Sequence, residues 1–442
     1  MKKYFCILLS FLFAGYTIPA AAQDSLHVDL KTALEIALSE SPVVRIANYE
    51  VERTHYARKE AQASLWPGIS ASGAYSRTLK KQVMVMDFNG QSMEISVGTD
   101  NNWMGSVNLS LPLVAPALWK TIQLSVLDID LAVEKARSSK LAMVSAVKKA
   151  FYSYMLAKDS YAVLKQNYDN VALNTKTVED KYNQGMASEY DKLRAQVELK
   201  NQRPNLLAAE TAIELASMQL KALMGLDIDY PVIFTGTLAQ YEDNVSPGSL
   251  VQAQITSLES NSDLKQLAIQ QQEMELALKI TKASFLPTLS LSSNFQYSSM
   301  NNNFKITEYH WFPYSTASLA LSIPIFSGFK KYQQVKQSQL NIKTLEDTRK
   351  NTERNLQVSV NNCLAQMTNA VEELASNKEN VSMAERAYSI SRKQFEIGMG
   401  TWLELSASEL AMTQAKLAYH QSVYNYLYYT AELDNVLGIN NL

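Results

Sequence analysis

Tyr182-Asn-Gln-Gly185-Met-Ala-Ser188-Glu-Tyr-Asp191 is repeated later in the chain as Phe395-Glu-Ile-Gly398-Met-Gly-Thr401-Trp-Leu-Glu404. Three further pairs of segments recur in the same order: Gln62–Pro67 with Lys282–Pro287, Leu109–Pro112 with Leu321–Pro324, and Leu223–Leu226 with Val436–Ile439. The separation is about 210 residues each time, far more than the ~20–50 residues of a solenoid repeat. The chain therefore reads as two related halves that serve one architecture.

Residues 1–22 have the pattern of a secretory signal. Lys2 and Lys3 precede an apolar run, Tyr4–Phe13, and Ala20–Ala22 form a small-residue cleavage site before Gln23. A transmembrane anchor is the alternative, but the run is shorter than the ~20 apolar residues that a spanning helix needs. We predict a mature chain in the periplasm, outside the cell, or in the outer membrane as a β-type membrane protein.

The composition favours long helices and a partner other than nucleic acid. Only 14 glycines and 11 prolines occur in 442 residues, and the formal net charge is −2. A slightly acidic chain lacks the basic surface that nucleic acid requires. Cys6 lies in the predicted signal, so Cys363 is the one cysteine expected to remain and no intrachain disulfide framework is predicted.

Helices are predicted in six ranges: 29–65, 116–184, 187–225, 249–286, 328–397 and 401–438. At ~1.5 Å per residue, 116–184 is roughly 100 Å long, close to the combined length of 29–65 and 187–225. Each half therefore predicts one long helix flanked by two shorter ones. Because Pro204 interrupts 187–225, and an interior proline costs ~3 kcal/mol or more, a bend or break is expected near Arg203.

Helix 401–438 carries two apolar rows with a heptad period. One row is Leu403, Leu410, Leu417, Tyr424 and Ala431, and the other is Leu405, Met412, Tyr419, Tyr426 and Leu433. The rows start two residues apart, a rotation of about 200° around the helix. The helix is either buried in a globular bundle or part of a ring in which each helix contacts two neighbours.

Four segments alternate apolar with small or polar residues, which predicts strands: Ile69–Tyr75, Trp103–Leu111, Leu289–Tyr297 and Ala317–Ile323. Weakly alternating segments of ~10 residues are typical of transmembrane β-strands. Residues 84–100 and 299–312 are expected to be polar, Asn-rich loops. Because four strands would leave two open edges in lipid, at several kcal/mol per unpaired backbone group, the sequence predicts an obligate homo-oligomer.

At this point the chain resembles the TolC family of outer-membrane efflux proteins. The resemblance covers essentially the whole mature chain. It rests on the doubled Gly185 and Gly398 turn segments, on the Leu-Pro and Ile-Pro strand boundaries, and on Ile325–Gly328. The first half has Leu113–Pro116 in place of Ile325–Gly328, so its strand-to-helix junction is expected to be atypical.

The resemblance implies a mainly α fold with a membrane β-barrel portion, in the outer membrane of a Gram-negative bacterium. Long coiled-coil helices of a homotrimer would form an α-barrel in the periplasm, and four strands per chain would complete a 12-stranded barrel in outer-membrane lipid. It further implies a passive exit channel of a tripartite efflux or type I secretion system, exporting small toxic molecules or proteins. The implied partners are a periplasmic adaptor and an inner-membrane pump of the RND, ABC or MFS type.

The resemblance also suggests a division of the chain. Residues 23–226 would be the first TolC-like repeat, with strands at about 68–83 and 102–112. Residues 227–248 would be an equatorial linker, and 249–442 the second repeat, with strands at about 288–299 and 314–325.

Two acidic residues are candidates for the channel tip. Ser188 with Asp191, and Thr401 with Glu404, have the spacing of capping boxes, so each carboxylate is expected to serve at least as a helix start. In the family, acidic residues after these turns line the tip, so a trimer would present six carboxylates and favour cations. The turns themselves, with Gly185, Ser188, Gly398 and Thr401, are candidates for adaptor contact.

The tip departs from the family's type member. A second acid one turn further on is matched here by Ala407, and an arginine and a tyrosine that latch the tip are matched by Gly400 and Phe395. A charged latch is therefore expected to be absent or rebuilt.

No catalytic, cofactor or metal site is predicted. His27, His55, His310 and His420 lack metal-ligand spacing, and Cys363 lies on an apolar helix seam. The alternatives to a channel are a periplasmic adaptor and a structural coiled-coil protein. Neither requires paired strand segments at matched places in both halves.

Overall fold

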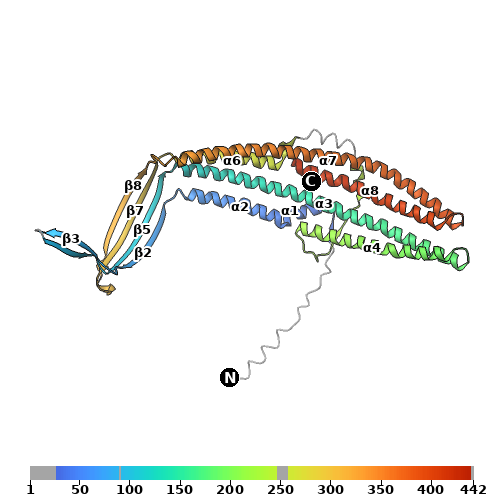
Figure 1. The fold of residues 1–442 in the computed structure, drawn as a ribbon, viewed down its shortest axis with the longest axis horizontal. Helices are drawn as coiled ribbons and strands as arrows, with labels where there is room; N and C mark the ends of the chain where they lie inside the picture. Colours follow the sequence, from blue (N-terminus) through green and yellow to red (C-terminus); the bar gives the residue numbers. More distant parts are fainter. Residues whose placement is uncertain (1–25, 89–90, 246–256, 440–442) are drawn as a thin grey trace, which may run out of the picture.

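The computed structural model describes residues 26–88, 91–245 and 257–439. Three predicted features lie outside the described residues. They are the signal 1–22, the last part of the linker 227–248 and the start of the helix 249–286. Figure 1 shows an elongated molecule with a bundle of long helices at one end and a strand region at the other.

The helices are α1 (Leu30–Glu40), α2 (Pro42–Ala63), α3 (Pro116–Asn183), α4 (Glu189–Met224), α6 (Ser262–Ala283), α7 (Lys330–Glu396) and α8 (Trp402–Leu437). Three 3-10 turns accompany them: η1 (Leu238–Asn244), η2 (Leu258–Ser260) and η3 (Ile306–Glu308). The long helices α3 and α7 contain 68 and 67 residues. α2 and α6 lie along their halves nearest the strands, and α4 and α8 along their far halves (Figure 1).

Three helix boundaries differ from the sequence-based prediction. The predicted helix 29–65 is broken at Ser41 because Pro42 occupies the first turn of α2, where its missing N–H needs no partner. α6 begins only at Ser262, where the Asn261 side chain accepts a hydrogen bond from the Leu264 N–H. Of the bend or break predicted near Arg203, the break is wrong, because α4 continues through Pro204. α4 packs along α3 through Ala195 and Ala209 on either side of that proline, which offsets its cost.

The sheet contains four antiparallel strands in the order β2 (Gly68–Arg77), β5 (Asn101–Val114), β7 (Thr288–Asn301) and β8 (Phe312–Ser322). β5 and β7 come from different halves of the chain and pair from Asn101 with Asn301 to Val114 with Leu289. The two halves therefore share one sheet, and β2 and β8 are its unpaired edges.

The prediction of a polar loop at 84–100 is wrong. β3 (Gln82–Phe88) and β4 (Gln91–Val97) form a separate two-stranded antiparallel hairpin. The strands are rich in β-forming residues, in Val83–Met86 and in Met93–Val97, where apolar and polar residues alternate in the second segment. The Asn89-Gly90 dipeptide between them is a strong hairpin signal in the sequence.

The two strand-to-helix junctions differ, as predicted. After β5, α3 begins directly at Pro116 in its first turn. After β8, Gly328 and Phe329 both have φ of 61° before α7 begins. In the first half, Pro116 therefore stands where the second half has a left-handed turn.

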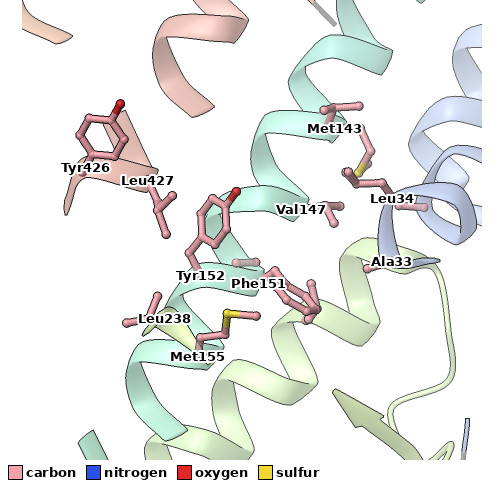
Figure 2. Packing of buried hydrophobic residues seen from close by; sticks show 14 of the residues in the cluster. Ala33, Leu34, Met143, Val147, Phe151, Tyr152, Met155, Leu238, Tyr426 and Leu427 are labelled. Atoms are coloured by element: carbon pink, nitrogen blue, oxygen red, sulfur yellow. The ribbon is translucent and has the colours of Figure 1, made fainter. Parts of the chain in front are cut away.

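The main core lies at the middle of the helical part. β1 (Leu26–Val28) pairs in parallel with β6 (Val232–Phe234), and this small ladder lies against α3. Figure 2 shows side chains of α1, α3, α8 and η1 gathered there, with Phe151 and Met155 of α3 near the centre. This core holds α1, the end of α4 and the end of α8 against the long helices α3 and α7. Within the described ranges, no helix is both long enough and apolar enough to cross a membrane.

Gly225 ends α4 at this core, and we predict that it tolerates no side chain. Its φ is 74°, and an added Cβ would lie 2.8 Å from the carbonyl oxygen of Glu40. Gly225→Ala is expected to lose about 1–2 kcal/mol from the left-handed backbone and about 1–3 kcal/mol more from overpacking. Urea denaturation followed by circular dichroism measures the loss.

Gly185→Ala is the matched control, because its φ of 76° is similar and nothing lies within 4 Å of an added Cβ. Equal destabilisation by the two substitutions would show that the close approach between α1 and α4 does not constrain Gly225.

Candidate functional site

The two repeated turns lie together at the end of the helices farthest from the sheet (Figure 1). Gly185 and Gly398 have φ of 76° and 80°. The Met186 N–H bonds to the Lys181 carbonyl at 2.8 Å, and the Met399 N–H bonds to the Gln394 carbonyl at 2.9 Å. Both glycines therefore end a long helix in the left-handed conformation, and neither has a nearby atom that fills the space around it.

Each turn is followed by a side-chain cap, and the two caps differ. Thr401 Oγ1 accepts from the Glu404 N–H at 3.3 Å, and Glu404 Oε2 accepts from the Thr401 N–H at 2.9 Å, which is a full capping box. Ser188 Oγ accepts from the Asp191 N–H at 3.1 Å and donates to Asp191 Oδ2 at 2.6 Å. The Asp191 carboxylate thus accepts a hydrogen bond from the Ser188 hydroxyl, whereas the Glu404 carboxylate accepts one from a backbone N–H.

Both carboxylates are available at the tip surface. Glu404 is exposed and Asp191 is half-buried. The hydrogen bonds from the Thr401 backbone and hydroxyl lower the pKa of Glu404 below its ordinary value, so this group is ionised at neutral pH. The caps leave the negative charge in contact with solvent.

Below the turns, a small apolar cluster joins the α3–α4 pair to the α7–α8 pair. Its buried members are Val178, Ala195, Tyr388, Phe395, Trp402, Leu405 and Met412. The Lys181 ammonium lies 4.1 Å from the centre of the Phe395 ring and donates to the Phe395 carbonyl oxygen. Ser406 donates to both carboxylate oxygens of Glu198, at 2.7 and 2.8 Å. Lys181 and Trp402, which the sequence analysis did not single out, hold the two turns together.

A buried carboxylic acid lies beside this cluster, between its members Leu405 and Met412 on α8. Glu409 of α8 is only 2 % exposed. Its Oε2 accepts from Asn174 Nδ2 at 3.1 Å, whereas Oε1 has no hydrogen-bond partner among the described residues. Burial, with a smaller contribution from the nearby Glu198 carboxylate, raises the pKa of Glu409 to about 7, while Asn174 and Arg392 oppose the shift.

Further buried polar side chains lie near Glu409 and form a polar seam with it among α3, α4 and α8. Thr413 donates to Asn167 Oδ1 at 3.1 Å, and Thr175 donates to the Ala195 carbonyl at 3.2 Å. The sequence signal for this seam is Glu409, a charged residue between Leu405 and Met412 on an otherwise apolar face of the helix.

Among the described residues, no group of three or more His, Cys, Asp and Glu side chains is placed to hold a metal ion. Cys363 lies in the main core, where burial raises the pKa of its thiol. The tip therefore combines two exposed, helix-capped turns that carry carboxylates with a buried polar seam.

Comparison with known proteins agrees with this geometry. The family described as "Outer membrane efflux protein" matches residues 33–226 and 256–439. The outer membrane protein TolC of Escherichia coli (strain K12) is 20 % identical over 453 residues, covering 100 % of this chain and 87 % of TolC.

Solved channel structures share the fold. A membrane protein from Pseudomonas aeruginosa aligns with a TM-score of 0.74 and 17 % identity, covering 92 % of each chain. The Campylobacter jejuni CmeC outer membrane channel aligns with a TM-score of 0.72 and 18 % identity, covering 92 % of this chain and 85 % of CmeC.

We predict that Glu409 makes tip stability depend on pH. Because its folded pKa of about 7 lies above the ordinary 4.5, the stabilisation by the proton is complete below pH ~4.5 and is lost as the pH rises through ~7. Glu409→Gln, which stays neutral, is therefore expected to exceed the wild type in unfolding free energy at pH 8.5 by up to about 3 kcal/mol. At pH 4.5 the two proteins should be similar.

Urea unfolding at both pH values, followed by the fluorescence of Trp402 in a variant that keeps only this tryptophan, measures the difference. Glu372→Gln, which changes an exposed carboxylate of α7, controls for the loss of one charge. An advantage of Glu409→Gln that is the same at both pH values contradicts the prediction.

Proposed function

Because this chain belongs to the outer membrane efflux protein family, we propose that three copies form a passive exit duct that receives its cargo from a pump complex. The chain is an outer membrane efflux channel that extends into the periplasm, and it is a transporter rather than an enzyme. The open edges β2 and β8 of its sheet are the observation that carries the proposal of an oligomer.

The sheet requires neighbours to complete it. Unpaired backbone groups in lipid cost several kcal/mol each, so spanning strands must close into a barrel. β8 of one copy and β2 of the next would pair, and three copies would contribute twelve strands. The exposed Leu319 and Leu321 of β8 and Ile69 of β2 supply apolar side chains next to these edges.

The two apolar rows of α8 support the same assembly. Leu405, Met412, Tyr426 and Leu433 are buried against the chain's own helices. Leu403 and Leu410 of the other row remain 54 % and 53 % exposed. α4 likewise exposes Tyr190, Leu193 and Val197 near the tip. The exposed side chains of α8 and α4 are placed to pack between neighbouring subunits, which favours the ring of helices over the globular bundle.

The tip is proposed as the gate and docking end. Three copies would place Asp191 and Glu404 of every chain around one opening, where their charges favour cations. The exposed turns with Gly185, Ser188, Gly398 and Thr401 are proposed to meet helical hairpins of a periplasmic adaptor, which connects the duct to an inner-membrane pump of the RND, ABC or MFS type. Small toxic molecules or proteins are the proposed cargo.

The tip charges are tested by Asp191→Asn combined with Glu404→Gln. Both replacements keep a side-chain oxygen for the helix caps and remove the charge. We expect the cation preference of the channel to fall by about half or more, measured as the reversal potential in a KCl gradient across a planar bilayer.

Glu372→Gln with Glu373→Gln, on an exposed part of α7 away from the tip, is the control. An unchanged reversal potential in the tip variant would mean that Asp191 and Glu404 act only as caps.

The exposed row is tested by Leu403→Asp combined with Leu410→Asp. Because more than half of each side chain is exposed in the subunit, the helical circular dichroism should persist while charge repulsion and lost apolar contact dissociate the trimer. Mass photometry of the purified protein in detergent gives the oligomeric state.

Ala411→Asp, at an exposed position outside the row on the same helix, should leave trimers intact. Trimers that survive the double substitution rule out this row as a subunit contact.

A further inference from the structure

The β3–β4 hairpin extends beyond the four-stranded sheet, at the end of the molecule opposite the helical tip (Figure 1). Within the part of the chain that the structure describes, its extensive contacts are between its own two strands. An isolated two-stranded hairpin is at best marginally stable in water. Further contacts are therefore needed to hold it.

One face of the hairpin is strongly apolar. The register places Met84 opposite Ile95, Met86 opposite Met93, and Gln82 opposite Val97. Directly opposite residues point to the same side of a sheet, so the five apolar side chains share one face. Their exposed fractions lie between 39 % and 56 %.

The other face is mixed. Val83 and Val85 lie there opposite Ser96 and Glu94, and Ser92 Oγ donates to Asp87 Oδ1 at 2.5 Å. This face can keep its charges in water while the methionine face is covered. Methionine is suited to such a contact because its flexible thioether adapts to irregular surfaces.

The base of the hairpin is fixed to the sheet, so the hairpin has a defined direction. Lys81 pairs with Asp100 at 3.2 Å, across the base of the hairpin, and donates to Asn302 Oδ1 at 2.9 Å. The Asp100 N–H donates to the same oxygen at 3.1 Å. Asn302 follows β7, so the connection between β7 and β8 holds the hairpin.

Both outer edges of the hairpin are open to pairing. Exposed edges in soluble proteins are commonly protected by lysine or proline, and neither residue occurs in Gln82–Phe88 or Gln91–Val97. β2, which leads directly into this hairpin, is itself an open edge of the main sheet. An assembly that closes the sheet through β2 brings another copy of the chain next to the hairpin.

We propose that the β3–β4 hairpins of one channel associate with one another through the methionine face and their open edges, and form a collar that narrows the outer mouth. The occupant of the face is thus a second copy of this chain. The proposal rests on the trimer of the proposed function. It places a second constriction at the end opposite the carboxylate tip, where hydrophobic side chains restrict ions by excluding water.

Cross-linking tests the contact. In a Cys363→Ser background, Met86→Cys and Glu94→Cys place a thiol on the methionine face and on the opposite face of the hairpin. A short bis-maleimide applied to purified channels is expected to give covalent dimers with Met86→Cys and about tenfold fewer with Glu94→Cys, since a reagent of limited reach joins only close thiols. Intact trimers with equal or no cross-linking at the two positions overturn the collar and leave the proposed channel standing.

Conductance tests the constriction. Met84→Ser combined with Met86→Ser and Met93→Ser should raise single-channel conductance by about twofold, whereas Val83→Ser with Val85→Ser on the other face should leave it unchanged. Equal effects of the two variants overturn the collar.

A solvatochromic dye on Met86→Cys distinguishes lipid as the occupant. A blue shift already present in detergent-purified trimers supports contact between copies, and a shift that appears only in lipid vesicles overturns it. If the unmodified protein forms no trimers, the proposed function fails and the collar, which rests on the trimer, fails with it.

Discussion

The unpaired backbone of β2 and β8 is the constraint on which the rest of the structure depends. A four-stranded sheet has two open edges, and these cannot remain unpaired in lipid. Within one chain, β5 and β7 from the two halves pair along their whole length, so neither of these strands is an open edge. In the proposed assembly, other copies pair with the remaining edges, so the subunit is complete only as part of the oligomer. The long helices follow from the same arrangement, since each hairpin of the sheet leads into one of them.

The two halves share a plan but not their details. Glu404 closes a full capping box, whereas Asp191 is held by the Ser188 hydroxyl alone. The position of Glu409 corresponds in the first half to Gln196, which donates to Glu179 at 2.7 Å. Because Gln196 is a neutral amide and Glu409 is a buried acid, the second half has a titratable contact that the first half lacks. α8, the helix that carries Glu409, packs against both long helices. A change in the charge of Glu409 therefore affects contacts with both halves of the chain.

Much of this fold was predictable from the doubled segments. The predicted family, the mainly helical fold with a four-stranded sheet, and the efflux channel are confirmed. The errors have local causes. The polar residues around Asn89-Gly90 concealed the alternation of β3 and β4. Pro42 breaks a helix at a first turn, whereas Pro204 is tolerated because packing on α3 outweighs one lost hydrogen bond. Glu409 was missed because the rows of α8 were traced through apolar residues only. The roles of Asp191, Glu404 and the turn residues remain predictions, because they depend on how copies meet around an axis that one chain does not contain.

The two ends of the molecule are held by different interactions, and this difference assigns them different mechanical roles. At the sheet, continuous backbone ladders fix the register from Gly68 to Ser322, and sliding one strand would break many hydrogen bonds at once. At the tip, the two helix pairs meet through a small apolar cluster, the Lys181 contact with Phe395 and the Ser406 contact with Glu198. These are side-chain contacts near solvent, whose loss costs far less than the separation of strands in lipid. Local opening follows the region of lowest stability. In the proposed assembly, relative movement of the helix pairs is therefore expected at the tip and not within the sheet.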